Sequence, residues 1–249
     1  MKEKFYNRCM NKDNTPNLIY GRNASREALR AKRVLKVFVS NAFHDNSILN
    51  LIKDQSIPCE VVNKQELDNM SKGGVHQGIV SKVKPYEYTP LEVILKRCKN
   101  VERPILVLLD GVVDPHNLGA ILRCADVFGV NGVLIGKHDQ VGLNSTVAKT
   151  SAGAINYVPV AQIGNINQTL QALKDNGFWI VSADGNCSKS YLDMDYDFPT
   201  VLVIGNEGDG ISKLVLKNSD FIVKIPMYGQ VNSLNASVAA GILLARIKR

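Results

Sequence analysis

Apolar residues in the second half of the chain gather into short continuous runs of strand length, separated by longer segments of mixed character. The runs are ILVLLD (105–110), GVLIG (132–136), FWIVSAD (178–184), TVLVIG (200–205) and FIVKIP (221–226). Runs without polar alternation are typical of parallel strands that are covered on both faces. The segments that predict helices are 116–128, 145–154, 167–176, 211–217 and 233–247. The pattern therefore predicts an α/β, Rossmann-like sandwich with about five or six strands.

The first part of the chain alternates shorter strands and helices. We expect strands near 17–21, 34–40, 59–63 and 77–83, with helices near 23–31, 46–54 and 64–70. Such alternation implies parallel pairing through helical crossovers. The chain then divides into a flexible polar tail over 1–16, a small α/β domain over 17–84, a linker with a first helix over 85–100, and a larger domain over 101–249.

The basic excess of the chain lies wholly in its first part. Residues 1–100 hold 18 Lys and Arg against 10 Asp and Glu, whereas residues 101–249 hold 12 against 13. Within the basic part, four arginines follow near-helical spacing: Arg22, Arg26, Arg30 and Arg33. A stripe of this kind is often only the solvated face of a helix. The imbalance between the two parts favours the alternative, a surface that binds nucleic acid.

Polar residues gather where the predicted strands of the larger domain end. The set consists of Asn117, Arg123, Glu207, Ser233 and Asn235. Open α/β sheets place their ligands beyond such strand ends. We expect Asn117 in a loop, with Arg123 almost two helical turns later. Arg123 has mainly apolar and small neighbours, and a charged group in that setting needs a partner or a ligand.

Part of this set also has simpler explanations. Glu207 is a candidate partner for Arg123, and a structural salt bridge would account for both residues. Ser233 or Asn235 would serve as the N-cap of the last helix, because Ser and Asn are preferred there. A cap accounts for only one residue of the cluster of hydroxyls and amides in NSLNAS (232–237).

Other common site signatures are missing from the chain. There is no GxxxxGK[ST] phosphate loop, no GxGxxG after the first strand of the larger domain, and no GxSxG elbow. The glycines of GNEGDG (205–210) predict either a tight turn or a loop that approaches a ligand closely. Histidines and cysteines are scattered, so we expect no metal and no disulfide framework. No apolar run is long enough to span a membrane. The cysteines are scattered and odd in number, so the reducing cytoplasm is the expected compartment.

Three segments together resemble the motifs of the SpoU (TrmH-type) RNA 2′-O-ribose methyltransferases. They are LLDGVVDPHNLGAILRCADVFGV (108–130), VLVIGNEGDGIS (201–212) and IPMYGQVNSLNASVAAGILLAR (225–246). The three match jointly and in order. The first domain, from LIYGRNASREAL to HQGIVSKV, resembles the substrate-binding domain of the family. The whole plan is similar to the RlmB-like subgroup, which methylates a guanosine ribose in 23S rRNA.

This resemblance implies a fold, a cofactor and a set of site residues. The larger domain would contain the deep trefoil knot of the SPOUT class, and the smaller one would be an L30e-like domain that binds the RNA substrate. S-adenosylmethionine would be the methyl donor, held around Ala183, Gly205, Ile225 and Leu234. The catalytic set would be Asn117, Arg123, Glu207, Ser233 and Asn235. Family members are homodimers that pair through the knotted domain.

Several alternatives stay open at this point. Arg123 would be either the base that removes the 2′-hydroxyl proton or a clamp for the neighbouring phosphate, because arginine is normally far too basic to be neutral near pH 7. The RNA would be rRNA or, in the runner-up hypothesis, tRNA. A third hypothesis is a non-catalytic RNA-binding or ribosome assembly factor on the same fold.

Overall fold

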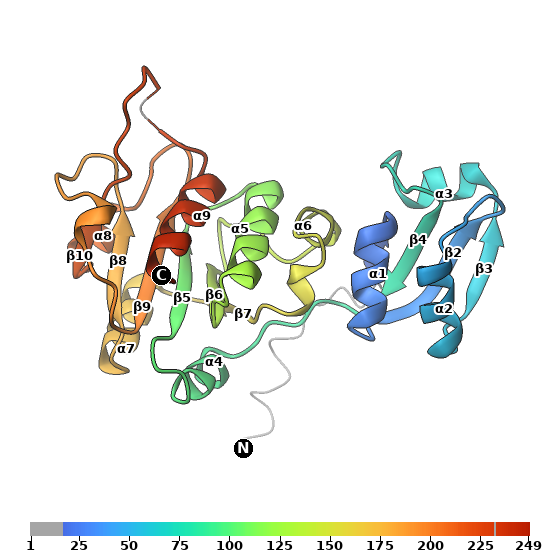
Figure 1. The fold of residues 1–249 in the computed structure, drawn as a ribbon, viewed down its shortest axis with the longest axis horizontal. Coiled ribbons are helices and arrows are strands. Elements are labelled where there is room, and N and C mark those ends of the chain that lie inside the picture. Colours follow the sequence, from blue (N-terminus) through green and yellow to red (C-terminus); the bar gives the residue numbers. More distant parts are fainter. Residues whose placement is uncertain (1–16, 232) are drawn as a thin grey trace. The chain divides into compact units, whose positions relative to one another are not determined.

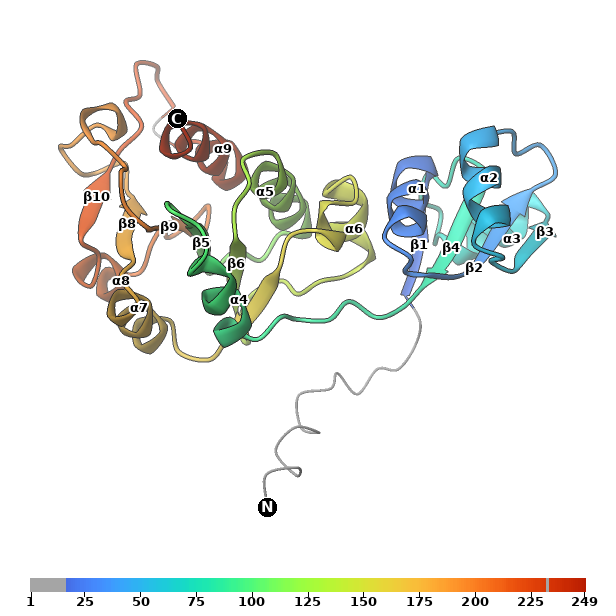
Figure 2. The same cartoon turned by 60° about the horizontal axis from the view of Figure 1, so that its bottom comes forward.

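The computed structural model describes residues 17–231 and 233–249, which form two compact units. The division falls between Tyr86 and Glu87, and the elements of each unit are labelled in Figure 1 and seen from a second direction in Figure 2. The flexible tail expected over 1–16 lies outside the described residues. In the part of the chain that is described, no helix is both long and apolar enough to cross a bilayer.

The first unit is built on a four-stranded mixed sheet. Its elements are β1 (Asn17–Tyr20), α1 (Arg22–Arg30), β2 (Val34–Ser40), α2 (Asn46–Asp54), β3 (Cys59–Val62), α3 (Lys64–Met70) and β4 (Ile79–Val83). The strand order is β1-β4-β2-β3, and β2 pairs with β3 in parallel, as expected. The expectation of parallel pairing throughout was wrong, because β4 runs antiparallel to both β1 and β2.

The short connection before β4 explains this reversal. A parallel crossover must carry the chain back along the sheet, and α1 and α2 have nine residues each for this purpose. Helix α3 has seven residues and spans only about 10 Å. Residues 71–78 then turn tightly, with positive φ at Lys72, Gly73, Gln77 and Gly78. The chain therefore re-enters the sheet from the end at which β3 stops.

The second unit is built on a six-stranded parallel sheet. Its strands are β5 (Ile105–Asp110), β6 (Gly132–Gly136), β7 (Val160–Ile163), β8 (Trp179–Ala183), β9 (Thr200–Gly205) and β10 (Phe221–Val223). They lie in the order β10-β8-β9-β5-β6-β7. The predicted α/β sandwich is confirmed. Strand β7 was not predicted, because Pro159 stands directly before it and Gln162 interrupts its short apolar run.

Helices cover the two faces of this sheet as separate layers (Figure 2). One layer holds α4 (Leu91–Cys98), α7 (Ile166–Asp175) and α8 (Lys213–Lys217), and the other holds α5 (Pro115–Val127), α6 (Ser145–Thr150) and α9 (Ala236–Ile247). Short 3₁₀ turns follow α6 and β8, as η2 (Ala154–Asn156) and η3 (Tyr191–Asp193). In the first layer, Ile94 and Leu173 are buried in the same cluster as Leu108 and Val203 of the sheet. Helix α5 packs beside both α6 and α9 (Figure 1).

Gly119 allows α5 to approach α6 closely. A Cβ at this position would lie 2.7 Å from Cβ of Thr150 and 2.9 Å from the backbone nitrogen of Ser151. Both atoms belong to the end of α6 and cannot move away as a flexible side-chain tip would. The contact therefore fixes the first turns of α5, and with them the side chain of Asn117.

We expect Gly119→Ala to lower the free energy of unfolding by about 1–3 kcal/mol, the usual cost of overpacking a filled contact. Urea unfolding of the full chain measures this. Gly164→Ala is the matched control, because a Cβ there has no atom within 4 Å, and a change below about 0.5 kcal/mol is expected. Equal effects of the two substitutions would mean that the α5–α6 contact relaxes freely.

Candidate active site

The carboxyl ends of neighbouring strands form the edge at which most of the candidate residues gather. Gly205, the last residue of β9, lies opposite Asp110, the last residue of β5. On the other side of β9, strand β8 ends at Ala183. These strand ends are close because all three strands are parallel and adjacent in the sheet. Loops that leave this edge are therefore in a position to surround one ligand.

A tight turn after β9 carries Glu207. The Asn206 N–H donates to the carbonyl of Gly210 at 3.2 Å, and the Asn206 side-chain oxygen accepts from two backbone N–H groups within the turn, at 2.8 and 2.7 Å. A Cβ on Gly205 would lie 2.5 Å from the backbone nitrogen of Ile211. Gly205 must therefore be glycine. The segment is a tight turn, and it also lies at the carboxyl edge of the sheet, so the two interpretations of the glycine motif are compatible.

Asn117 is buried at the start of α5 and joins two other segments. Asp114 caps the helix by accepting from the His116 N–H at 2.8 Å. The Asn117 amide nitrogen donates to a carboxylate oxygen of Glu207. Its oxygen accepts from the amide nitrogen of Asn235 at 2.8 Å. The expectation that Asn117 lies in a loop was wrong, because Pro115 and the Asp114 cap start the helix before it.

Asn235 serves both as a helix cap and as part of this network. Its side-chain oxygen accepts from the backbone N–H of Ser237 at 2.9 Å and from the Ser237 hydroxyl at 2.6 Å. Helix α9 begins at Ala236 and not at Ser233, so Ser233 precedes the helix and is exposed. The two explanations of Asn235 are therefore compatible, because the oxygen caps the helix and the amide nitrogen reaches Asn117.

Arg123 lies apart from this network. Its position is six residues after Asn117 on α5, which places it about 120° away around the helix, and its side chain is exposed. Among the described residues it forms no ion pair with Glu207, which accepts from Asn117 instead. The pairing of Arg123 with Glu207 was wrong, because α5 directs Arg123 away from the side on which Asn117 meets Glu207.

The four residues expected to hold a cofactor lie around the same edge. Ala183 and Gly205 close β8 and β9, and Ile225 follows the end of the adjacent strand β10 by two residues. Leu234 precedes α9 and is 36% exposed. Met227 and other apolar side chains that lie between Ile225 and Leu234 in the chain are exposed. Backbone groups and exposed apolar side chains of this kind suit a nucleoside and an aliphatic chain attached to it.

The four arginines of the first unit differ in their surroundings. Arg26 pairs with Asp45, the cap of α2, at 2.8 Å, and Arg30 pairs with Glu27 at 2.7 Å. Arg33 lies beyond the end of α1 and donates to the carbonyl oxygens of Lys84 and Pro85 at 3.1 and 2.6 Å. Arg22 is exposed, with its guanidinium 5.5 Å from the ring centroid of Phe43. The residues therefore do not form one uniform stripe.

Sequence reasoning missed two polar residues that shape these surfaces. A carboxylate oxygen of Asp110 accepts from the Ser212 N–H at 2.8 Å and so anchors the segment after the Glu207 turn. The signal for it was an Asp that closes an apolar run. Gln77 accepts from the Arg22 N–H at 2.9 Å and occupies the start of α1, which has no side-chain cap of its own. No local pattern predicts a partner 55 residues away.

No group of three or more His, Cys, Asp or Glu within residues 17–231 and 233–249 is arranged to hold a metal ion. Cys59, Cys98, Cys124 and Cys187 are free.

Most of the second unit matches a known family. The family described as the SpoU rRNA methylase family matches residues 104–245. The chain belongs to this family. A further family, described as RNA 2′-O ribose methyltransferase substrate binding, matches residues 18–89. The resemblance stated from the sequence is thereby confirmed for both parts of the chain.

Individual SpoU proteins are similar over nearly the whole chain. A Staphylococcus aureus (strain COL) protein, whose name assigns it to the TrmH family of tRNA/rRNA methyltransferases, is 44% identical over 237 residues, 93% of this chain and 95% of that protein. The crystal structure of the SpoU methyltransferase AviRb from Streptomyces viridochromogenes with AdoMet has a TM-score of 0.77 and 23% identity, and the match covers 94% of this chain and 89% of that one. At this identity the likeness is one of fold.

A shorter SpoU protein matches less of the chain. The A. aeolicus TrmH/SpoU tRNA modifying enzyme has a TM-score of 0.54 and is 34% identical, and the match covers 64% of this chain and 82% of that one. The two proteins described before it match 93% and 94% of this chain.

The hydrogen bond between Asn117 and Asn235 is expected to appear as an energetic coupling. In a double-mutant cycle of Asn117→Ala and Asn235→Ala, measured by urea unfolding, we expect a coupling of about 0.5–3 kcal/mol. Asn235→Ala alone should cost about 1 kcal/mol or more, because it removes the cap and leaves the Asn117 oxygen unpaired.

The control cycle pairs Asn117→Ala with Asn165→Ala. Asn165 caps α7 by accepting from the Gln168 N–H at 3.1 Å, and no contact joins it to Asn117 among the described residues. The two substitutions should therefore be additive. Additivity in the first cycle as well would show that the amide contact does not connect α5 to α9.

Proposed function

We propose that this protein transfers the methyl group of S-adenosylmethionine to a ribose 2′-hydroxyl in RNA, and that its substrate is a guanosine of 23S rRNA. The observation that carries the proposal is the network of Asn117, Glu207 and Asn235 at the carboxyl edge of the parallel sheet. It holds polar side chains from the start of α5, the turn after β9 and the cap of α9 beside the strand ends where α/β sheets bind ligands. The family match supports the reaction, and the AdoMet complex of a protein with the same fold supports the cofactor.

The cofactor would be held by the ends of three adjacent strands. The residues in this role are Ala183, Gly205, Ile225 and Leu234. When bound, S-adenosylmethionine supplies a methyl group on a sulfonium, which a nucleophile can displace directly. The glycine turn gives the backbone close access to this ligand. Glu207 and Asn117 position the turn, and Ser233, exposed before α9, would contact the cofactor or the ribose.

Arg123 would act on the RNA rather than on the cofactor. Its exposed guanidinium is free to meet a phosphate in bidentate geometry and to polarise the neighbouring 2′-hydroxyl. The alternative role, removal of the hydroxyl proton, requires a strongly lowered basicity, which an exposed site does not favour. We therefore favour the phosphate clamp. Much of the rate would then come from holding the two reactants in line.

We infer that the protein acts as a homodimer through α5 and α9. These two helices pack beside each other, and both leave apolar residues at the surface: Val127 of α5 is 71% exposed and Val238 of α9 is 49% exposed. Arg123 lies one turn before Val127 on the same side of α5. A second copy seated on this face would therefore lie next to Arg123, and the RNA would meet groups of both copies there.

The deep trefoil knot also stays a proposal. The chain leaves β10 at one edge of the sheet, and α9 then packs against β9 and α5, farther into the sheet. Such a return path across the segment after β9 is what a knot at the cofactor site requires. The fold likeness to SpoU methyltransferases supports it.

The first unit would bind the RNA substrate around the start of α1. Arg22 is exposed there, and its backbone N–H donates to Gln77 of the 71–78 turn. Lys72 and Val75 of the same turn are also exposed. Because Arg26 and Arg33 have partners within the unit, we expect Arg22 to contribute most of the phosphate contact. The substrate-binding match supports rRNA over tRNA as the target, since the tRNA modifying enzyme matches only 64% of this chain.

The activity is tested by incubating the protein with methyl-labelled S-adenosylmethionine and, separately, 23S rRNA and total tRNA. We expect label in rRNA, located at a ribose 2′-oxygen by resistance to alkaline cleavage. Arg123→Ala should reduce transfer severely, with cofactor affinity by calorimetry near that of the unchanged protein. Arg123→Lys should retain measurable activity if the group clamps phosphate.

The outcomes separate the hypotheses. Label in tRNA alone would replace the rRNA target, and binding of RNA without transfer would identify a non-catalytic factor. Full activity in Arg123→Ala would remove this residue from the mechanism.

RNA affinity should depend on Arg22 more than on Arg26. We expect Arg22→Gln to weaken RNA binding and to reduce the slope of log affinity against log salt by about 1, the loss of one phosphate contact. Arg26→Gln, the matched control, should mainly lower stability through the lost pair with Asp45. Filter binding across a salt series measures both, and an unchanged slope for Arg22→Gln would place the RNA on another surface.

A further inference from the structure

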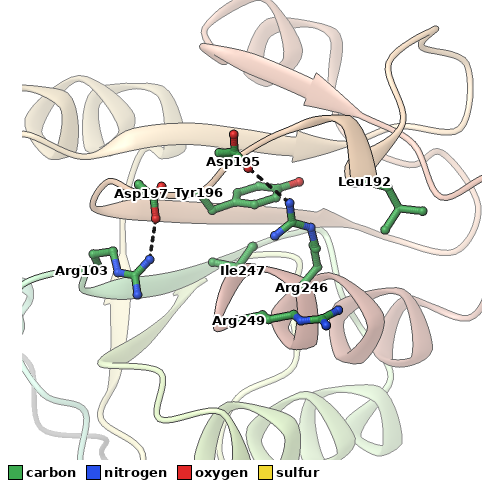
Figure 3. A pocket seen from close by; sticks show the side chains of 8 residues that line it. All are labelled: Arg103, Leu192, Asp195, Tyr196, Asp197, Arg246, Ile247 and Arg249. Carbon is green, nitrogen blue, oxygen red and sulfur yellow. Dashed lines mark hydrogen bonds and ion pairs between the residues drawn. The ribbon is translucent and has the colours of Figure 1, made fainter.

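The second unit has a hollow at the edge of its sheet opposite the candidate active site. Its volume is about 430 Å³, and it is lined by Arg103, by residues 195–197 and by Arg246 and Arg249 of the chain end (Figure 3). Arg103 stands before β5, and residues 195–197 stand before β9. Because these strands have six residues, roughly 20 Å separates the hollow from the carboxyl edge. The hollow is therefore a separate feature of the molecule.

The arginines and the carboxylates of this hollow differ in how exposed they are. Arg246 has only 24% of its side chain exposed and donates to the carbonyl of Met194 at 2.8 Å. Its carboxylate partner, Asp195, lies 3.6 Å away and is 92% exposed; Arg103 pairs with Asp197, which is 78% exposed, at 2.6 Å. Exposed pairs of this kind are weak and screened by salt. The two carboxylates can therefore swing away and leave guanidinium groups for another anion.

Aromatic rings pack beside the hollow, from the buried Tyr196 through the half-buried Phe198 and Phe221 to the exposed Trp179. The centroid of Tyr196 lies 6.5 Å from that of Phe198, which lies 5.7 Å from both Trp179 and Phe221. A smaller hollow of about 70 Å³ is lined by both Tyr196 and Phe198, so the rings and the charged groups are contiguous. Trp179 is 46% exposed.

Cations stand at both ends of this aromatic row. The Lys189 ammonium lies 5.4 Å from the Phe221 centroid, and the Arg246 guanidinium lies 5.5 Å from the Tyr196 centroid. Proteins bind single-stranded nucleic acid with exposed rings beside positive groups, because a base stacks on the ring and phosphates meet the cations. Trp179 is the exposed ring here, and the other rings support it from below. An acidic peptide would use the arginines but would leave the Trp179 face uncovered.

We propose that this edge of the second unit binds a single-stranded segment of the RNA, with phosphates at Arg103 and Arg246 and a base stacked on Trp179. In the absence of RNA, Asp195 and Asp197 occupy the positions of the phosphates. The proposal rests on the proposed function only in that the substrate is RNA. It adds a contact remote from the site of methyl transfer, which holds RNA that flanks the modified nucleotide.

Trp179 gives a direct readout, because it is the only tryptophan of the chain. Titration of the full-length protein with a short oligouridylate should quench its fluorescence. Trp179→Ala, followed by the anisotropy of a labelled oligouridylate, should weaken binding about five-fold to 150-fold, the range for loss of one stacked base. The double variant Arg103→Gln with Arg246→Gln should also weaken it. Asp195→Asn with Asp197→Asn should strengthen it about two-fold to five-fold.

Arg97→Gln is the charge-matched control. Arg97 is exposed on α4, which covers the face of the sheet opposite to α9, and it does not line the hollow. Its affinity for the oligouridylate should match that of the unchanged protein. Calorimetry with S-adenosylmethionine verifies that each variant keeps the fold of the second unit, since no residue of the hollow lies at the cofactor edge.

Three results would overturn the proposal: unquenched Trp179 fluorescence, unchanged affinity in the double arginine variant, or weaker binding after removal of the two carboxylates. A change in oligomeric state by sedimentation, with RNA affinity unchanged, would instead assign the hollow to contact between copies of the chain. If the protein methylates rRNA but the oligouridylate does not quench Trp179 fluorescence, the proposed function stands and only this binding site is removed.

Discussion

The buried amide of Asn117 joins three segments that are 90 and 118 residues apart in the chain: the start of α5, the turn after β9 and the cap of α9. Each hydrogen bond contributes only about 0.5–1.5 kcal/mol, but a buried polar group left unpaired costs about 1–3 kcal/mol. The asymmetry makes the network restrictive. If either the Glu207 turn or the α9 cap moves away, one end of the amide loses its partner, so the two segments keep their positions together.

The sequence predicted the elements of the second unit well because its strands are buried on both faces. A run such as 105–110 has no polar interruption, and the length and flanking turn residues then decide for a strand. Strand β7 has only four residues, and Gln162 interrupts its apolar run, so the pattern does not identify it as a strand. In the first unit the elements were predicted, but the direction of β4 depends on how the 71–78 turn folds, and alternation of helices and strands carries no information on that.

The candidate site was predicted by position along the chain and only partly by contact. Strand-end placement correctly indicated the edge around Gly205, Glu207 and Asn235. It did not indicate which side chains touch. Arg123 and Glu207 are both charged yet separate, because α5 points Asn117 toward Glu207 and Arg123 to another side. Counting basic residues has the same limit, because a count does not show which of them are engaged within the protein. Arg33, for example, donates to the backbone carbonyl of Pro85. Its charge also opposes the burial that raises the pKa of Tyr86 to about 12.

Asn235 lies 118 residues after Asn117 in the sequence, and this separation affects the order in which the protein folds. Its partner Asn117 belongs to the first strand-helix pair of the second unit, so the ends of the network meet only after a loop of more than a hundred residues has closed. Contacts of such long sequence separation form slowly, because chain entropy is lost before the contact is gained. During synthesis, the first unit is complete long before this closure, since domains fold as units from the N-terminus. A nascent chain would therefore hold its first unit in folded form while the Asn117 network of the second unit is still open.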